Sequence, residues 1–294
     1  MTRNRFVGLA ALLLSATFAA TTTAEEPAAK IVLIAGRPSH GPGDHEFNAG
    51  CKLMAERLAN VPGVEPVLVA GGWPKDESVF DGAKALVFFM DGGAGHPAIQ
   101  GDHLEKLQKL VDQGVGLAFM HYGVEVPKGE PGDTFLNWIG GYYETGYSTN
   151  PHWKAEIQSL PDHPITRGVK PFAVVDEWYY NIRFRPDMEG VTPILVATPD
   201  DKTRDTSHTS PAGPYKHIQE AKGRPEVLAW VVERPDGGRG YGFTGGHAHA
   251  NWGDPNFRKL NLNALLWTAG LDVPEGGVAS EVSPEELKAN LDPK

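Results

Sequence analysis

Gly114-Val-Gly-Leu-Ala-Phe-Met-His-Tyr-Gly123 is the stretch that decides the fold of this chain. Residues 115–120 form an almost unbroken apolar run, typical of a strand buried on both faces of a parallel sheet. The run ends abruptly at His121. Ligands of open α/β sheets bind beyond the carboxyl ends of the strands, so His121 is expected where such a fold performs its chemistry. The alternative is a core histidine that only ends the strand.

The residues before this stretch follow a regular alternation of strands and helices. Apolar runs predict strands over 30–35, 64–69 and 85–90, and helical spacing of apolar side chains predicts helices over 47–58 and 100–113. With the strand over 115–120, the order is β-α-β-β-α-β. The sequence therefore predicts an α/β fold with a flavodoxin-like, mostly parallel central sheet flanked by helices.

The residues after Gly123 are richer in aromatics and prolines and predict shorter elements. We expect helices over 134–139 and 257–269, and a last strand from Arg239 that runs into His247. Other strands are expected over 153–158, 172–175, 194–197 and 227–232. No linker is long enough to divide the chain, so we expect one domain over 25–274 and a C-terminal tail over 275–294.

The N-terminus has the pattern of a secretory signal peptide over residues 1–24. Arg3 and Arg5 precede an apolar run over 6–20, and the small residues up to Ala24 suit a cleavage site. The run is too short for a comfortable membrane span, so membrane insertion is not expected. The sequence thus predicts an exported protein, periplasmic or secreted.

Charge and cysteine content exclude several classes of function. Removal of residues 1–24 takes away two arginines and no acids, which moves the formal charge from −10 to −12 and disfavours a nucleic-acid partner. Cys51 is the only cysteine, so an internal disulfide, a haem attachment motif and a thiolate zinc site are all excluded. Cys51 lies on the apolar face of a predicted helix and is expected in the core.

The Gly/Pro-rich loop over 36–45 lacks both the dinucleotide fingerprint and the Walker lysine, so no nucleotide cofactor is expected. It carries His40, Asp44 and His45 instead, followed by Glu46, which suits a metal or a polyol better than a phosphate. Ser39 and Ser148 are not set in a nucleophile-elbow motif, so serine catalysis is disfavoured.

Three of the 11 histidines follow strands whose carboxyl ends should meet. His45, His121 and His247 come after the first, fourth and last strands, and neutral imidazole is a common ligand of zinc. The sequence thus predicts a site for a divalent metal such as zinc, completed by Glu46 or Glu177. The alternative is that these histidines are solvated loop residues.

Glu177 lies in the aromatic segment Asp176-Glu-Trp-Tyr-Tyr180. Desolvation by such neighbours can raise the pKa of a carboxyl group and suit it to acid–base work. Aromatic faces also bind sugar rings, and Trp178 and Tyr179 are candidates for that role. The alternative is that the aromatic side chains pack within a strand.

Several motifs together resemble a known family. They are Gly-x-Gly-Leu-x-x-x-His over 114–121, His163-Pro-Ile-Thr-Arg-Gly168, Asp176-Glu-Trp-Tyr179, Gly238-Arg-Gly-Tyr-Gly-Phe-Thr-Gly-Gly-His247 and Asn263-Ala-Leu-Leu-Trp-Thr-Ala-Gly270. Their order and spacing over about residues 30–272 are similar to those of the ThuA-like, or trehalose-utilisation, family.

This resemblance implies a fold similar to class I glutamine amidotransferases, but histidine stands where those enzymes carry their cysteine, so amidotransferase activity is not expected. It implies a role with trehalose-like disaccharides, through 3-keto intermediates made by a partner sugar dehydrogenase. The family's polar signature falls on His45, His121, His163, Glu177 and His247. We also expect His163, Trp178, Tyr179, Tyr122 and Trp153 to bind substrate. His249 and the tyrosine-rich segment over 141–147 depart from the family pattern.

The sequence leaves more than one function open. In the first, the chain is an exported enzyme that processes a keto-glycoside or related sugar by hydrolysis, elimination or isomerisation, with His121 or Glu177 as the catalytic base. His45 and His247 would then hold the metal or the ketone oxygen. In the second, the chain is a non-catalytic sugar-binding protein that keeps the cleft. A structural module of a secreted assembly is the third.

Overall fold

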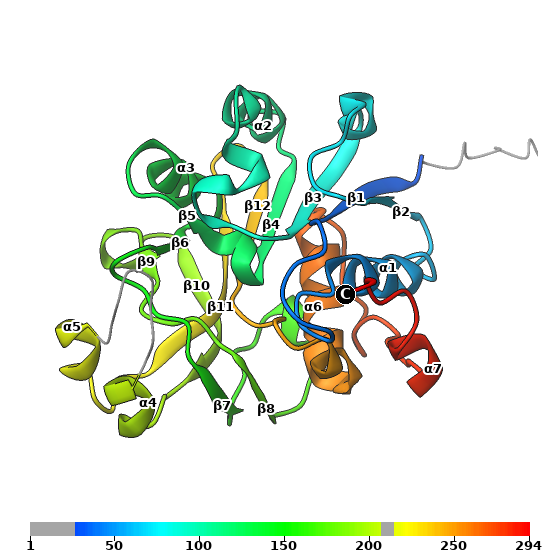
Figure 1. The fold of residues 1–294 in the computed structure, drawn as a ribbon. Helices are drawn as coiled ribbons and strands as arrows, with labels where there is room; N and C mark the ends of the chain where they lie inside the picture. The colour runs from blue at the N-terminus through cyan, green and yellow to red at the C-terminus, as the bar shows by residue number, and fades with distance from the viewer. Residues whose placement is uncertain (1–26, 207–214) are drawn as a thin grey trace, which may run out of the picture.

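The computed structural model describes residues 27–206 and 215–294, which excludes the predicted signal peptide. Its centre is a seven-stranded sheet (Figure 1). In spatial order the strands are β10 (Val191–Ala197), β11 (Glu226–Glu233), β12 (Arg239–Phe243), β4 (Gly116–Met120), β3 (Ala83–Phe89), β1 (Ala29–Ala35) and β2 (Val64–Val69). The five strands from β12 to β2 are parallel, whereas β10 and β11 run antiparallel to their neighbours. The predicted flavodoxin-like architecture is confirmed.

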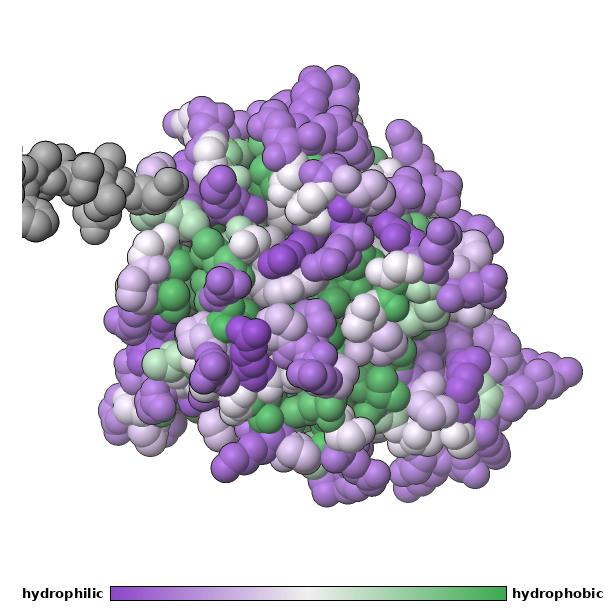
Figure 2. All heavy atoms as spheres, turned by 180° about the vertical axis from the view of Figure 1, so that it is seen from behind, coloured by the Kyte–Doolittle hydropathy of each residue, from purple (hydrophilic) through white to green (hydrophobic). Residues whose placement is uncertain are grey.

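Helices cover both faces of this sheet, because its strands are apolar on both sides. In β1, Ile31 and Leu33 pack into one core cluster and Val32 and Ile34 into the other. The first cluster lies under α1 (Phe47–Leu58) and α6 (Pro255–Thr268), and the second lies under α2 (His103–Val111) and α3 (Glu130–Ile139). Seen from behind, the surface is largely hydrophilic, with apolar residues visible between polar side chains (Figure 2).

The stretch over 114–123 contributes β4, the strand in the middle of the sheet. Every residue of β4 is buried, and Gly116 packs so closely on α6 that a Cβ there would lie 1.9 Å from the carbonyl oxygen of Thr268. His121 follows directly and begins a 3₁₀ turn over His121–Val124. The predicted last strand is shorter than expected: β12 ends at Phe243, and residues 244–248 form a loop.

Smaller elements of the second half lie beside the main sheet. β5 (Glu125–Val126), β6 (Gly141–Glu144) and β9 (Arg183–Phe184) form one small sheet, and β7 (His152–Ile157) pairs antiparallel with β8 (Phe172–Glu177). Three short helices are α4 (Asp201–Thr206), α5 (Lys216–Gln219) and α7 (Pro284–Leu287). The chain end lies beside α1 (Figure 1). Within the described residues, no helix has the length and apolar character needed to span a membrane.

Candidate metal centre

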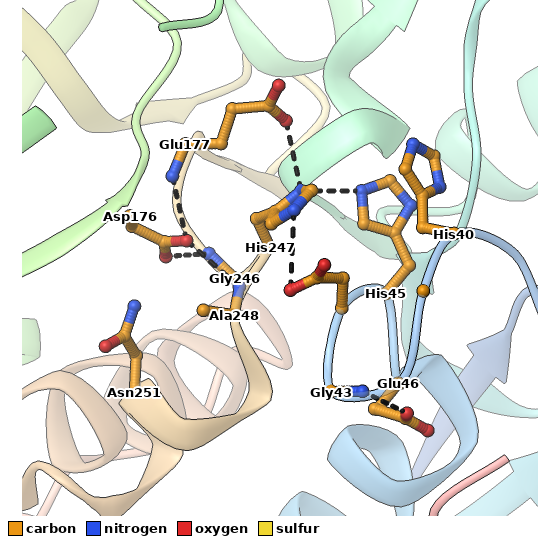
Figure 3. A network of polar contacts seen from close by, with 12 residues as sticks. His40, Gly43, His45, Glu46, Asp176, Glu177, Gly246, His247, Ala248 and Asn251 are labelled. Carbon is orange, nitrogen blue, oxygen red and sulfur yellow. Dashed lines mark hydrogen bonds and ion pairs between the residues drawn. The ribbon is translucent and has the colours of Figure 1, made fainter. Parts of the chain in front are cut away.

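Four side chains converge at the carboxyl edge of the sheet, where the parallel strands end. Figure 3 shows His45, Glu177 and His247 of this group. The Nε2 atom of His45 lies 3.0 Å from Nε2 of His121 and 3.0 Å from Nδ1 of His247. The Oε2 atom of Glu177 lies 3.1 Å from Nδ1 of His247 and 3.6 Å from Nε2 of His121. We call this group the four-residue centre. It confirms that the loops after β1, β4 and β12 meet.

The backbone delivers two of these histidines in an unusual conformation. His45 and His121 have φ values of 48° and 53°, in the left-handed region that non-glycine residues seldom occupy. Each such residue costs about 1–3 kcal/mol and persists only when the surrounding structure holds it, which happens most often at functional sites. The strained backbone at these two positions lowers the stability of the fold, and it directs both rings at the same point.

A second hydrogen bond fixes the tautomer of each of these two rings. Nδ1 of His45 lies 2.8 Å from a carboxylate oxygen of Asp91, and Nδ1 of His121 lies 3.1 Å from the carbonyl oxygen of Thr244. Carbonyl and carboxylate oxygens only accept, so Nδ1 must carry the proton in both rings. The Nε2 atoms that face each other are then lone pairs. Partners of this kind orient metal-binding histidines in proteins.

Burial keeps these two rings neutral. It is the largest influence on both, and lowers the pKa of His45 and, more strongly, that of His121. At His247 burial also opposes protonation, but the hydrogen bond and charge of Glu177 outweigh it and raise the pKa. A proton on Nδ1 of His247 can form a hydrogen bond to Nε2 of His45 or to Glu177. No proton lies between the Nε2 atoms of His45 and His121, because both rings carry theirs on Nδ1. Two lone pairs 3.0 Å apart repel each other, and a cation between them removes that repulsion.

The geometry of the four-residue centre fits a divalent metal. Zinc–nitrogen bonds of 2.0–2.1 Å in a tetrahedron would space the ligand atoms by roughly 3.3 Å. Four of the six spacings among these atoms, from 3.0 to 3.6 Å, lie around that value, and all the ligand atoms lie within 4.8 Å of one another. Three imidazoles form a ligand set of catalytic zinc sites, which keep a fourth position for water or substrate. The Glu177 carboxylate would then adjoin the ion. These residues could therefore hold a metal ion.

A second group, formed by His40, His45 and Asp91, differs from the four-residue centre. The hydroxyl oxygen of Ser39 lies 3.1 Å from Nδ1 of His40, 3.2 Å from Nδ1 of His45 and 3.0 Å from Asp91. The hydroxyl group can donate to the carboxylate and accept from His40, while Nδ1 of His45 donates to Asp91, so these groups already satisfy one another. This second group supports His45 and needs no ion of its own.

Asp176 holds the loop that carries His247. Its buried carboxylate accepts hydrogen bonds from the backbone N–H groups of Gly246 at 2.6 Å and Ala248 at 3.0 Å (Figure 3). Burial raises the pKa of Asp176 in spite of these bonds. The neighbouring Glu177 is oriented by Asn150, whose side-chain amide donates to Oε1 at 3.0 Å.

Glu46, one of the two carboxylates expected to complete the metal site, faces away from it. Its carboxylate accepts from the N–H groups of Gly43 and Asp292, and Lys294 lies 3.4 Å away as an ion pair. Burial alone would raise the pKa of Glu46, but these hydrogen bonds lower it. The expectation for Glu46 was wrong because Asp292 and Lys294, near the C-terminus, already bind its carboxylate oxygens.

A comparison with known protein families identifies the family of this chain. The family model described as ThuA, trehalose utilisation, matches residues 73–268, which is more than half of the chain. The chain belongs to the ThuA family. A crystal structure of a ThuA-like protein from Bacteroides uniformis aligns with 15% identity and a TM-score of 0.53, over 86% of this chain and 96% of that one.

Two further comparisons concern a second solved structure and the curated proteins. The N-terminal domain of mmIFT52 aligns with 12% identity and a TM-score of 0.48, over 84% of this chain and all of that one. No curated protein matches the chain. The ThuA-like structure supports the fold, and the chemistry has to be argued from the residues.

The residues that we expected to bind substrate fall into two sets. Tyr179 and Tyr122 lie beside the four-residue centre: the Tyr179 hydroxyl is 3.4 Å from Nε2 of His121, and the half-buried Tyr122 ring lies 6.0 Å from that of His45. Burial raises the pKa of both tyrosines, to about 12 for Tyr122. Both can contact a ligand at this edge.

The other three lie elsewhere. Trp178 is fully buried against Phe243, and the indole N–H of Trp153 donates to the carbonyl oxygen of Trp178, so both belong to the core. His163 packs on Trp267 near the start of β12, whereas His247 follows the end of that strand. None of the three contacts the four-residue centre.

Our sequence reading missed the roles of Asp91, Asp176 and Asn150. Asp91 directly follows the strand predicted over 85–90, and β3 lies between β1 and β4, whose loops carry His45 and His121. That position was a usable signal. Asp176 was read only as a neighbour of Glu177, and Asn150 has no sequence signal that links it to the site.

Proposed function

We propose that this chain is a metal-dependent enzyme that processes a carbohydrate, such as a keto-glycoside or a trehalose-like disaccharide. Membership of the ThuA family supports the substrate class. The single observation that carries the metal is the 3.0 Å contact between the Nε2 atoms of His45 and His121. Both rings use their only proton elsewhere, so this contact calls for a cation.

His45, His121 and His247 are the residues that would hold the metal. His121 has both ring nitrogens engaged, one with Thr244 and one in the centre, which suits a ligand better than a base. A bound divalent metal would supply a Lewis acid for a substrate oxygen. His121 and Glu177 were the two candidates for the catalytic base, and the assignment of His121 as a metal ligand favours Glu177.

Glu177 is the base in this proposal. Its side chain is 14% exposed whereas that of His121 is fully buried, so substrate can reach it. Asn150 holds Oε1, and Oε2 faces the centre. A ketone acidifies the neighbouring C–H bond, and a carboxylate at that point can take its proton while a glycosidic substituent is eliminated. Hydrolysis and isomerisation of a keto-sugar use the same residues.

The chain would act outside the cytoplasm, and its substrate would come from an oxidation. The pattern of a signal peptide that the sequence shows over 1–24 supports this proposal of export. A keto-sugar forms when a dehydrogenase oxidises a sugar hydroxyl, so an enzyme of that class would supply the substrate. The net negative charge argues against a nucleic-acid partner.

Metal analysis of protein purified without a histidine tag tests the centre. We expect about one divalent metal per chain, lost in His45→Ala and His247→Ala but kept in the control variant His163→Gln, which lies outside the centre. Turnover of oxidised and unoxidised disaccharides, with and without a chelator, then tests the activity. Absence of a stoichiometric metal would overturn the metal site. Saccharide binding without turnover would favour the non-catalytic alternative.

A further inference from the structure

A cavity of about 360 Å³ lies beside the four-residue centre, at the same edge of the sheet. Its lining comes from the loops that follow β1, β2 and β3, and includes Arg37, Gly71, Trp73, Asp91, Gln100 and His103. This is the region where open α/β sheets bind ligands, and the volume is within the range of small-molecule sites. The proposed chemistry at the centre does not use this cavity.

Asp91 joins the cavity to the centre. Its Oδ1 atom contacts both Ser39 and Nδ1 of His45, and its side chain is 40% exposed. A ligand in the cavity that touches Asp91 is therefore separated from His45 by one side chain. A substrate with two linked units could place one unit at the centre and the other in the cavity.

The polar groups of the cavity lining indicate what kind of ligand fits. Nδ1 of His103 donates to the carbonyl oxygen of Pro97 at 2.6 Å, which leaves Nε2 as an acceptor. The amide nitrogen of Gln100 donates to two carbonyl oxygens, those of Ala94 and His96, which leaves its oxygen as an acceptor. Asp91 adds a carboxylate. These three side chains offer acceptors and Arg37 offers donors, so the lining calls for a ligand that both donates and accepts.

The charge of the lining points the same way. Arg37 is the cation and Asp91 the anion, so their formal charges cancel. A phosphate or carboxylate ion brings mainly acceptors and would meet the Asp91 carboxylate. Sugar hydroxyls both donate and accept and carry no charge. Trp73, stacked on His103 with ring centroids 3.7 Å apart, adds apolar surface of the kind that sugar rings contact.

We propose that this cavity is a subsite for the second sugar unit of the substrate, whose reacting unit lies at the four-residue centre. The inference rests on the proposed function for its reacting half, but binding in the cavity can be measured without turnover. Arg37 and Gln100 are exposed, so variants at these positions should keep the fold.

The first test is binding to protein stripped of metal by a chelator. Trehalose titrated into this protein should change the tryptophan fluorescence, and Trp73→Phe should remove most of the change. Arg37→Ala and Gln100→Leu should weaken trehalose binding about tenfold. The control Lys154→Ala, exposed in a separate cavity beside β7, should bind like the parent protein. A response to inorganic phosphate instead of trehalose would overturn the proposal.

The second test separates this inference from the proposed function. Gln100→Leu should raise KM about tenfold for a 3-keto disaccharide and leave KM unchanged for the matching methyl 3-keto-glycoside, which lacks a second unit. Equal effects on both substrates would overturn the subsite. If the parent protein turns over neither substrate but binds trehalose through Trp73, the proposed function fails and the subsite stands.

Discussion

The Asp91 carboxylate and the His45 ring are joined by a 2.8 Å hydrogen bond from Nδ1 to Oδ1, and this contact decides what the other ring nitrogen can do. Burial raises the pKa of Asp91, but the hydrogen bonds from His45 and Ser39 outweigh it and hold the pKa low, so the carboxylate is ionised. The proton of His45 therefore stays on Nδ1, and Nε2 presents a lone pair to the four-residue centre. Asp91 is a positioning residue for this lone pair.

Replacement of Asp91 should weaken metal binding in a graded way. Partners behind metal-binding histidines contribute about 10–100-fold in affinity. We expect Asp91→Asn, which can still accept through its amide oxygen, to lose about tenfold, and Asp91→Ala to lose up to about 100-fold. Competition with a chromophoric chelator measures both values. Asp81→Asn, an exposed carboxylate before β3, is the control, and equal affinity in all three variants would contradict the role of Asp91.

Asp176→Asn should affect both stability and metal binding. The carboxylate accepts hydrogen bonds from two backbone N–H groups of the loop that carries His247. In Asn one of these oxygens becomes an NH2 group, which is a donor and would face a backbone N–H without an acceptor. We expect a loss of about 1–3 kcal/mol in the free energy of unfolding of the metal-free protein, measured with denaturant. Metal affinity should also fall, since His247 loses its support. Asp162→Asn, which is exposed, should change neither quantity.

Removal of residues 290–294 should weaken metal binding more than it weakens the fold. The N–H of Asp292 and the Lys294 amine bind Glu46, which adjoins His45 in sequence, and Lys294 also donates to the carbonyl oxygen of Asp44. We expect about a tenfold loss of metal affinity with a small change in Tm. Lys52→Ala is the control, because it removes only an exposed contact with Asn290. Unchanged metal affinity after truncation would show that this segment does not position His45.

His96 should make the fold sensitive to mild acid. Burial lowers its pKa from the ordinary value of about 6.5 to about 4. Below pH 6.5 this histidine binds a proton in the unfolded chain but not in the folded one. The free energy of unfolding therefore falls between pH 6.5 and 4, by about 3 kcal/mol in total. Denaturant unfolding of chelator-treated protein at pH 7 and pH 5 should show about 2 kcal/mol of this loss, because the rest develops below pH 5. His96→Gln should lower stability at pH 7 but remove this share of the pH dependence, whereas the exposed His217→Gln should retain it.

The sequence was enough to predict the sheet and the meeting of three histidines. Apolar runs such as 115–120 identify buried parallel strands, and the carboxyl ends of such strands lie at one edge, so His45, His121 and His247 had to be neighbours once the strand order placed β12 beside β4. Local pattern and elementary topology contain that much information.

The remaining parts of the site depend on contacts that no local pattern reports. Glu46 and Glu177 were equal candidates, and the choice between them is made by C-terminal residues that occupy Glu46. Trp178 and Tyr179 are adjacent in sequence, but one packs in the core and the other contacts His121. His163 lies in a loop, and a loop's sequence does not state which end of the sheet it reaches.

The place of β12 in the sheet has a consequence for the order of events during synthesis. This strand comes late in the chain but pairs with β4 in the middle of the sheet, and the loop after it brings His247 to within 3.0 Å of His45. A ribosome-bound chain that has not reached residue 247 holds only His45, His121 and Glu177. The metal that we propose would therefore find all three of its histidines only in a chain that includes β12 and the loop after it.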